Sequence, residues 1–340
     1  MRTIIAGGGP SGLSAALYLS SKGVDTTVVE RLGDNYEKYH SICGAGISET
    51  AFKGLELISP TDVKNRIERT ELEFPGGIRV SMKVKGYVLD RVGFLESLKK
   101  RCASNGCRFI DARVISVRRT DDGFSVSTTE EELTCDKIVG CDGAFSVVRR
   151  DLFGSRPDMC AAVDYIVGGE PEPVFRIRLG ERYRGLYEWS FPAGDDVCIG
   201  SGRGFVIKEF KMKGARYIPF GGIPRISDGG AYLAGDAAGM ANPVSFGGLR
   251  VALRSGQEAA KDILSEGDYQ RWWDRCILSS ERFMGFRETM MSWTDEDFIK
   301  ASRPFRNCHN VWLSGIKATL THPKYLPMYY GCLMTFLHTW

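Results

Sequence analysis

The side chains of this sequence that could do chemistry include one cysteine in a glycine-rich segment and three aromatic residues close together. Cys43 lies within 41–48, Ser-Ile-Cys-Gly-Ala-Gly-Ile-Ser, whose glycines let the backbone come close to a ligand. Its thiol either faces that ligand or is a small buried group in a turn. Tyr187, Trp189 and Phe191 alternate along a predicted strand and therefore share one face. They either belong to a core or wall an apolar site for a substrate without polar groups at its reacting carbon.

A glycine-rich loop near the amino terminus has the spacing of a phosphate-binding turn. Gly7, Gly9 and Gly12 occupy the glycine positions of G-x-G-x-x-G. The first glycine permits a tight turn, the second lets the backbone approach a pyrophosphate, and the third lets a helix pack closely on a strand. The free N–H groups and positive dipole end of the following helix then face the phosphates.

The elements around this loop arrive in the order that dinucleotide binding requires. A short buried strand precedes the loop, and a helix and a second strand follow it. Glu30 ends the second strand, where it can accept hydrogen bonds from the hydroxyls of an adenosine ribose. The predicted elements are a strand over 2–6, a helix over 13–22 and a strand over 26–29. The cofactor-binding residues predicted in this unit are Gly7, Gly9, Pro10, Ser11, Gly12, Glu30 and Arg31.

Composition places the chain among ordinary globular proteins. It has 340 residues, of which 43% are hydrophobic and 26% charged, enough for about two domains. The net charge of +3 comes without a polybasic run, so we expect no nucleic-acid partner. The ten cysteines form no C-x-x-C pair and no metal-ligand cluster, which favours a reducing cytoplasm and no bound metal. No targeting segment and no membrane span are expected, whereas a peripheral membrane contact is left open.

The predicted fold is α/β, with a discontinuous nucleotide-binding domain, an inserted antiparallel sheet and a helical C-terminal region. A hairpin turning at Gly76-Gly77 and strands near 174–178, 185–192 and 197–200 form the inserted sheet. Asp90 is a predicted helix N-cap, and another helix is predicted over 249–264. The predicted domains are 1–70, 86–152 and 216–264 for nucleotide binding, 71–85 and 153–215 for the substrate sheet, and 265–340 for the helical region.

Three motifs together resemble flavoproteins of the p-hydroxybenzoate hydroxylase type. The glycine loop with Glu30 is followed by Asp142-Gly143-x-x-Ser146-x-x-Arg149 and then by Gly235-Asp236-Ala237-Ala238. The resemblance implies a Rossmann-like FAD-binding domain that holds FAD in extended form. It also implies that Asp236 binds the ribityl chain or pyrophosphate region. Pro243 and the N–H groups of Gly247 and Gly248 would lie beside the flavin's pyrimidine end, where a helix dipole stabilises the negative charge of reduced flavin.

Two shorter segments favour one branch of these flavoproteins. Residues 187–192, Tyr-Glu-Trp-Ser-Phe-Pro, resemble the Y-x-W-x-F-P signature of geranylgeranyl reductases, and 43–48 is similar to their C-G-x-G-I-S segment. Such enzymes saturate isolated double bonds of isoprenoid chains in archaeal lipids, quinone tails or chlorophyll side chains. The catalytic residues implied are Cys43, Tyr187, Trp189 and Phe191. The further cofactor contacts implied are Cys43, Gly44, Arg91, Asp142, Gly143, Gly235, Asp236, Pro243, Gly247 and Gly248, with a solvated surface arginine as the alternative for Arg91.

The reaction expected from this resemblance is hydride transfer from flavin N5 to one alkene carbon, with a proton reaching the other from water or Cys43. An unactivated alkene offers no oxygen to polarise, so the protein contributes mainly alignment, desolvation and a proton source. The expected partners are an isoprenoid or lipid substrate and an electron donor such as ferredoxin, reduced deazaflavin or NAD(P)H.

Two other functions are compatible with the same motifs. An FAD-dependent aromatic monooxygenase using NAD(P)H and O2 shares all three, and a flavin halogenase matches less well. A non-catalytic or membrane-associated flavin carrier would instead use the C-terminal aromatic residues as a docking surface. These aromatic residues are Tyr325, Tyr329, Tyr330, Phe336 and Trp340.

Overall fold

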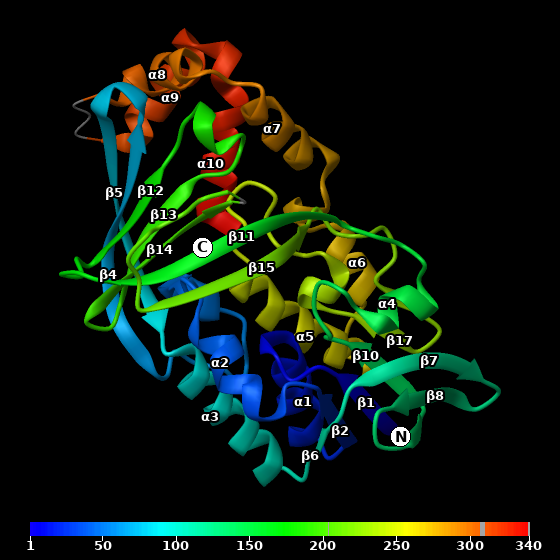
Figure 1. Ribbon diagram of the computed structural model, residues 1–340. Coiled ribbons are helices and arrows are strands. Elements are labelled where there is room, and N and C mark those ends of the chain that lie inside the picture. Colours follow the sequence, from blue (N-terminus) through cyan, green and yellow to red (C-terminus); the bar gives the residue numbers. More distant parts are fainter. Residues whose placement is uncertain (203, 307–309, 339–340) are drawn as a thin grey trace.

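A mainly parallel sheet with helices on it forms the lower part of the computed structural model (Figure 1), which describes residues 1–202, 204–306 and 310–338. Its strand order is β16-β17-β10-β1-β2-β6, and all its pairings except β16–β17 are parallel. The strands are β1 (Arg2–Ala6), β2 (Asp25–Glu30), β6 (Arg108–Asp111), β10 (Lys137–Gly140), β16 (Ser227–Asp228) and β17 (Ala231–Leu233). The predicted strand over 2–6 is confirmed, and Glu30 ends β2 as expected.

Helices α1, α3 and α5 belong to this lower part. They are α1 (Pro10–Ser21), α3 (Arg91–Ser104) and α5 (Leu249–Ile263). The predicted N-cap of α3 is confirmed, because the Asp90 carboxylate accepts the Gly93 N–H at 3.4 Å. A small three-stranded sheet, β7 (Val114–Thr120), β8 (Gly123–Thr128) and β9 (Glu132–Cys135), lies next to the parallel sheet, and α4 (Val147–Leu152) follows β10.

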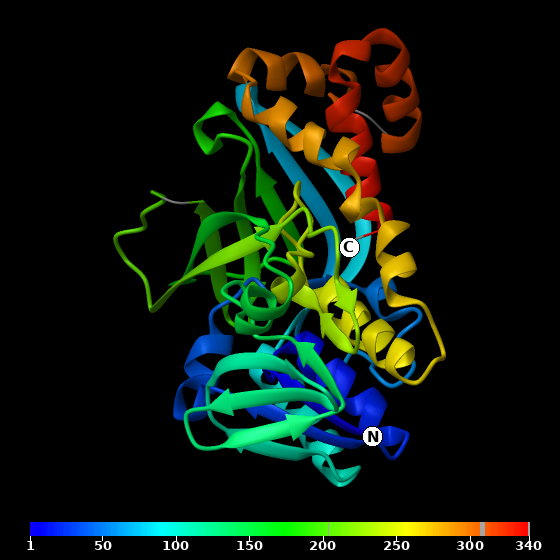
Figure 2. The ribbon, with the colours of Figure 1, turned by 90° about the vertical axis from the view of Figure 1, so that its right-hand side faces the viewer.

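A long, curved sheet rises from the first one and is mostly antiparallel (Figures 1 and 2). The predicted turn at Gly76-Gly77 is confirmed, but the two hairpin strands are longer than predicted. Strand β12 pairs in parallel with β4, so the sheet is not antiparallel throughout. In sheet order the strands are β15 (Met212–Phe220), β11 (Asp158–Gly168), β14 (Asp196–Gly202), β13 (Glu188–Ala193), β12 (Val174–Arg178), β4 (Val63–Phe74), β5 (Ile78–Leu89) and β3 (Gly46–Ser48). Strand β15 spans the predicted boundary at residue 216, and the division into domains stays a prediction.

The C-terminal region is helical. Its helices are α6 (Tyr269–Asp274), α7 (Glu281–Met291), α8 (Asp295–Ser302), α9 (Val311–Thr321) and α10 (Leu326–His338). Helices α8 and α9 cover the far end of the hairpin (Figures 1 and 2), whereas α6 lies beside α5. Trp293 and Phe298 pack with Phe74 of β4 in one apolar cluster. Tyr325 and Tyr329 are buried in the same cluster, so these two residues contribute to the core and not to a docking surface. The side chain of Phe336 and all of Trp340 lie outside the described residues.

None of the helices in the described ranges combines the length and the apolar character that crossing a bilayer requires.

The helix that begins at the glycine loop is held by α5. Gly256 of α5 faces the start of α1 so closely that an added Cβ would lie 2.1 Å from the Ser11 carbonyl oxygen. The Ser14 hydroxyl donates to the Leu253 carbonyl at 2.6 Å. Residues far apart in the sequence therefore fix the position of the phosphate-facing helix end.

We expect Gly256→Ala to lower the free energy of unfolding by about 1–3 kcal/mol, because its methyl group overlaps backbone atoms that cannot move away. Gly285→Ala in α7 is the matched control, since no atom lies within 4 Å of its added Cβ. This control should stabilise the protein by about 0.5–1 kcal/mol through higher helix propensity. Urea unfolding measures both values, and an equal response of the two variants would contradict the close packing.

Candidate active site

The glycine loop has the shape that a pyrophosphate requires. Gly7 has φ of +102° and leaves no room for a side chain, because its Cβ would lie 2.3 Å from the Cys141 carbonyl oxygen. A Cβ on Gly12 would lie 1.9 Å from the Gly7 carbonyl oxygen. Gly9 differs, because nothing lies within 4 Å of the position of its Cβ. Open space therefore lies beside Gly9, the glycine at which the backbone is expected to approach phosphate, and α1 starts there without a side-chain cap.

Glu30 is fixed beside this loop by backbone donors. Its carboxylate accepts the Gly8 N–H at 2.6 Å and the Leu32 N–H at 2.9 Å. Each oxygen retains a lone pair, so the carboxylate can still accept ribose hydroxyls. Arg31 next to it is exposed, and its predicted cofactor contact stays a prediction.

The motif from Asp142 to Arg149 connects the parallel sheet to the motif from Gly235 to Ala238. Ser146 is the N-cap of α4, and Asp142 accepts the Val147 N–H of the first turn of this helix at 2.6 Å. Burial raises the pKa of the Asp142 carboxyl group. The Arg149 guanidinium is buried and donates to the carbonyl of Ala237 at 2.7 Å and to that of Ala144 at 2.7 Å. Arg149 therefore holds the Gly235–Ala238 turn in place. The predicted cofactor contacts of Asp142, Gly143 and Gly235 are not tested by these interactions.

The loop before α5 is shaped by an asparagine. The Asn242 side-chain oxygen accepts the N–H groups of Val244 and Ser245 at 2.7 and 3.0 Å. Pro243 is buried within this turn, and Gly247 is exposed at its end. Gly248 is the N-cap of α5, and no side chain caps this helix start in the described part of the chain. The positive end of the α5 dipole therefore lies at this loop, where the pyrimidine end of a flavin is predicted to bind.

The cysteine segment packs directly on the aromatic strand. The Cys43 sulfur accepts a hydrogen bond from Arg91 Nη1 at 3.1 Å. A Cβ on Gly44 would lie 3.0 Å from the Phe191 ring and 3.9 Å from the Trp189 ring. Arg91 is half-buried and bonded to Cys43, which excludes the alternative of a solvated surface arginine. The two segments that suggested the reductase family therefore meet in space.

The aromatic residues lie side by side along β13 and the residue before it. The Tyr187 and Trp189 ring centroids are 5.7 Å apart, and Phe191 packs against Phe175 at 4.5 Å. The Tyr187 hydroxyl donates to the Ser245 carbonyl in the loop before α5. The three predicted aromatic residues thus reach from the cysteine segment to the loop expected at the flavin.

A buried carboxylate holds the Trp189 indole. Trp189 Nε1 donates to Asp164 Oδ1 at 2.8 Å, and the Cys198 thiol donates to the same oxygen at 3.4 Å. Gly200 faces Trp189 across the strands, where a Cβ would lie 2.3 Å from the indole. Burial raises the pKa of Asp164, and the Trp189 and Cys198 hydrogen bonds oppose that shift.

Two arginines bring positive charge to the junction between the sheets. Arg216 of β15 donates to the Ile42 carbonyl at 2.6 Å and also to the Tyr39 carbonyl. Burial raises the pKa of Asp236, whereas the charges of Arg91 and Arg216 lower it. The Asp236 side chain is nevertheless exposed to solvent.

A histidine at the same junction stays neutral. His40 lies in α2 (Tyr36–Ser41) and is 3% exposed. Burial, with the charges of Arg91 and Arg216, lowers the pKa of His40 to about 2. Its neutral ring packs against the Tyr36 ring at 4.4 Å between centroids, with the two planes tilted by 57°.

Sequence reasoning missed Asp164, Cys198, Arg216 and His40 as parts of this junction. A lone acidic or basic residue in a strand or short helix carries no motif, because its partners come from other strands. For Asp164 the sequence offered one signal, its position among apolar residues of β11. A carboxylate on a buried strand requires polar partners from elsewhere.

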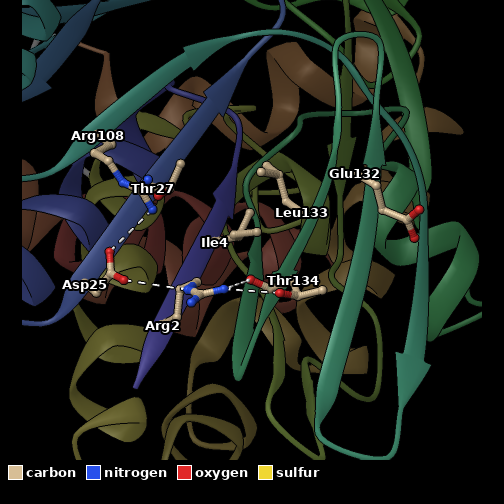
Figure 3. A pocket seen from close by; sticks show the side chains of 8 residues that line it. All are labelled: Arg2, Ile4, Asp25, Thr27, Arg108, Glu132, Leu133 and Thr134. Atoms are coloured by element: carbon tan, nitrogen blue, oxygen red, sulfur yellow. Dashed lines mark hydrogen bonds and ion pairs between the residues drawn. The ribbon is translucent and has the colours of Figure 1, made fainter.

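The cavity shown in Figure 3 lies elsewhere. It has a volume of about 450 Å³ and is lined by residues near the starts of β1, β2 and β6 and by Glu132, Leu133 and Thr134 of β9. Asp25 lies there between Arg2 and Arg108, at 3.7 and 3.6 Å. These are the amino ends of the parallel strands, whereas cofactors bind outside the carboxyl ends. The cavity is therefore not part of the candidate site.

The open space at Gly9 gives a direct test of the cofactor position. Gly9 has φ of −77°, which alanine adopts without strain, so Gly9→Ala should unfold within about 0.5 kcal/mol of the wild type. Its methyl group would occupy the space expected for phosphate, and we expect FAD affinity to fall at least about tenfold. Fluorescence titration of the apoprotein with FAD measures the affinity, and urea unfolding measures the stability.

Gly12→Ala is the contrasting variant, because its Cβ overlaps the Gly7 carbonyl. It should lose both stability, by about 1–3 kcal/mol, and FAD binding. Wild-type FAD affinity in Gly9→Ala would show that no phosphate lies beside this glycine.

Comparison with known proteins agrees with this geometry. The family described as FAD binding domain matches residues 1–69. Digeranylgeranylglycerophospholipid reductase of Methanothrix thermoacetophila is 26% identical over 87% of this chain and 89% of its own length. Digeranylgeranylglycerophospholipid reductase 1 of Methanopyrus kandleri is 29% identical over 78% of this chain and 81% of its own.

A solved structure shares the whole fold. The geranylgeranyl bacteriochlorophyll reductase-like protein of Thermoplasma acidophilum superposes with a TM-score of 0.77, over 96% of this chain and 97% of that chain, at 19% identity. This likeness confirms the predicted fold class, with its FAD-binding sheet, curved substrate sheet and C-terminal helices. The cofactor is FAD, and the chain is an FAD-binding flavoprotein related to the geranylgeranyl reductases.

Proposed function

We propose that this FAD-dependent oxidoreductase reduces isolated C=C bonds of an isoprenoid lipid or of a quinone or chlorophyll side chain. One observation carries the proposal: the Cys43 segment packs on the aromatic face of Trp189 and Phe191, next to the loop before α5. Reduction of an unactivated alkene requires a proton source, an apolar wall and a bound flavin, and the thiol, the aromatic residues and this loop are the proposed parts. The two relatives named above are called digeranylgeranylglycerophospholipid reductases, and these names support the same chemistry.

The aromatic wall suits a substrate with no polar group at its reacting carbon. Tyr187, Trp189 and Phe191 present ring surfaces, while their polar atoms are already satisfied by Ser245 and Asp164. An alkene chain held against such rings leaves no polar group unpaired, and water is excluded from the reacting carbons. Reduced FAD supplies the hydride when it is bound.

Cys43 is the proposed proton source. Its sulfur already accepts from Arg91, so its own hydrogen stays free to be given to an alkene carbon. The guanidinium would then lie against the negative charge left on sulfur, which stabilises the product of the proton transfer. The rate gain expected from such a positioned acid is about a hundredfold or more.

The electron donor is proposed to be a ferredoxin, a reduced deazaflavin or NAD(P)H. The test below avoids this choice because dithionite reduces bound flavin directly.

The experiment combines a spectrum with a product mass. Purified protein should show flavin absorbance that dithionite bleaches. Incubation of the reduced protein with a geranylgeranyl lipid should then add pairs of hydrogens, detected by mass spectrometry. Cys43→Ser should retain FAD and slow this reaction about a hundredfold or more. Cys276→Ser is the matched control, because that cysteine is half-buried in the helical region and contacts none of the residues named here.

Different results separate the alternatives. Full activity in Cys43→Ser would remove the thiol from the mechanism and leave water as the proton source. An unchanged lipid, together with NAD(P)H-dependent oxygen uptake on an aromatic substrate, would replace reduction by monooxygenation.

A further inference from the structure

Helix α9 carries an apolar surface that the rest of the described chain leaves uncovered. Trp312, Leu313, Ile316 and Leu320 are 63%, 66%, 62% and 78% exposed. The spacing of residues 312, 316 and 320 places them on one side of the helix. The opposite side holds Ala318, which is fully buried in the cluster formed with the hairpin and α10. The helix is therefore docked by one face and presents its larger apolar face to solvent.

The position of α9 keeps this surface accessible. The helix lies beside α8 at the end of the molecule farthest from the first sheet, in both views (Figures 1 and 2). Leu326, at the start of α10, adds a further side chain that is 44% exposed. A single exposed leucine needs no explanation, but several on one helix face indicate an interaction site.

The charged residues from the end of α8 through α9 are cationic, whereas the acidic residues of α8 lie in its first turn. The sequence from residue 298 to residue 340 contains no aspartate or glutamate. Arg303 and Arg306 precede α9 and are exposed, and Lys317 projects from α9 itself, with no carboxylate of the described residues within ion-pair distance. An apolar helix face with a tryptophan and flanking cations is the composition of helices that lie in a membrane interface.

We propose that α9 is an interfacial helix that binds this protein to the surface of an anionic lipid bilayer. Its apolar face enters the boundary between headgroups and acyl chains, and Arg303, Arg306 and Lys317 contact the anionic headgroups. A second copy of this chain fits less well, because a symmetric contact would bring a second set of the same three cations to the interface and no carboxylate from residues 298–340. Delivery of an isoprenoid lipid from that bilayer rests on the proposed function, whereas binding of α9 to lipid does not.

The test is sedimentation of the FAD-loaded protein with vesicles. Vesicles of phosphatidylcholine and phosphatidylglycerol in equal parts should carry wild-type protein into the pellet, with weaker binding to phosphatidylcholine alone and at high salt. The double variant Ile316→Ser/Leu320→Ser should lower the partition coefficient at least about tenfold. Lys317→Glu should lower it about tenfold on anionic vesicles.

A matched control uses two other exposed apolar residues. Val206→Ser/Phe210→Ser replaces side chains that are 72% and 46% exposed on the loop before β15, and it should bind vesicles as the wild type does. Equal losses in both double variants would overturn the assignment to α9.

Two results would overturn the proposal as a whole. The first is wild-type protein that stays in the supernatant with both vesicle types. The second is a dimer in sedimentation velocity that Ile316→Ser/Leu320→Ser abolishes, without vesicle binding, which would assign this surface to a second copy. Reduction of detergent-dispersed geranylgeranyl lipid by the wild type and by the α9 variant is measured alongside. Activity without vesicle binding would reject the proposed membrane surface and leave the proposed reductase function standing. Vesicle binding without activity would reject the reductase function and leave the membrane surface standing.

Discussion

The arrangement of the site depends on two arginines whose hydrogen bonds hold the cysteine segment where the sheets join. Arg91 belongs to the FAD-binding part, and Arg216 comes from the last strand of the curved sheet. Both charges act on Asp164 below the aromatic wall and on Asp236 in the third motif. Burial raises the pKa of both carboxyl groups, and these charges oppose that shift. The hydrogen bonds of the two arginines meanwhile tie the cysteine segment to α3 and to β15.

This junction has a structural consequence for the cysteine segment. Arg216 holds the Ile42 carbonyl, and Arg91 holds the sulfur of Cys43. The segment is thus restrained at both points while its glycine presses against Phe191. The hydrogen bonds to Arg91 and Arg216 satisfy polar atoms of this segment, and its other side packs on aromatic rings. The proposed function needs both properties, because a charged cofactor and an apolar chain would be bound in the same small region.

Local patterns in the sequence predicted much of the fold. The glycine loop, Glu30 at the end of β2, the Asp90 cap and the turn at Gly76-Gly77 each depend on a few neighbouring residues, so sequence alone was sufficient. The hairpin strands were predicted too short because alternation fades where both faces are partly exposed. The parallel pairing of β12 with β4 joins distant segments and leaves no local signal.

The candidate site divides in the same way. Cys43, Trp189 and Asp236 belong to short motifs and were predicted, whereas the contact of Arg216 with Ile42 joins residues 174 positions apart. No periodicity reports such a pair. Helix α9 shows a related limit: an apolar stripe predicts a helix face, but only the fold shows that this face is uncovered.

Amide hydrogen exchange in the 39–46 segment tests the junction most directly. In Arg216→Met we expect this segment to exchange at least about tenfold faster than in the wild type, because its two carbonyls lose their donor. Exchange in β1 serves as the internal reference for overall unfolding. Arg225→Met is the matched control, since that arginine pairs with Asp228 at 3.7 Å at the surface. Equal exchange of the segment in the wild type and Arg216→Met would contradict the account.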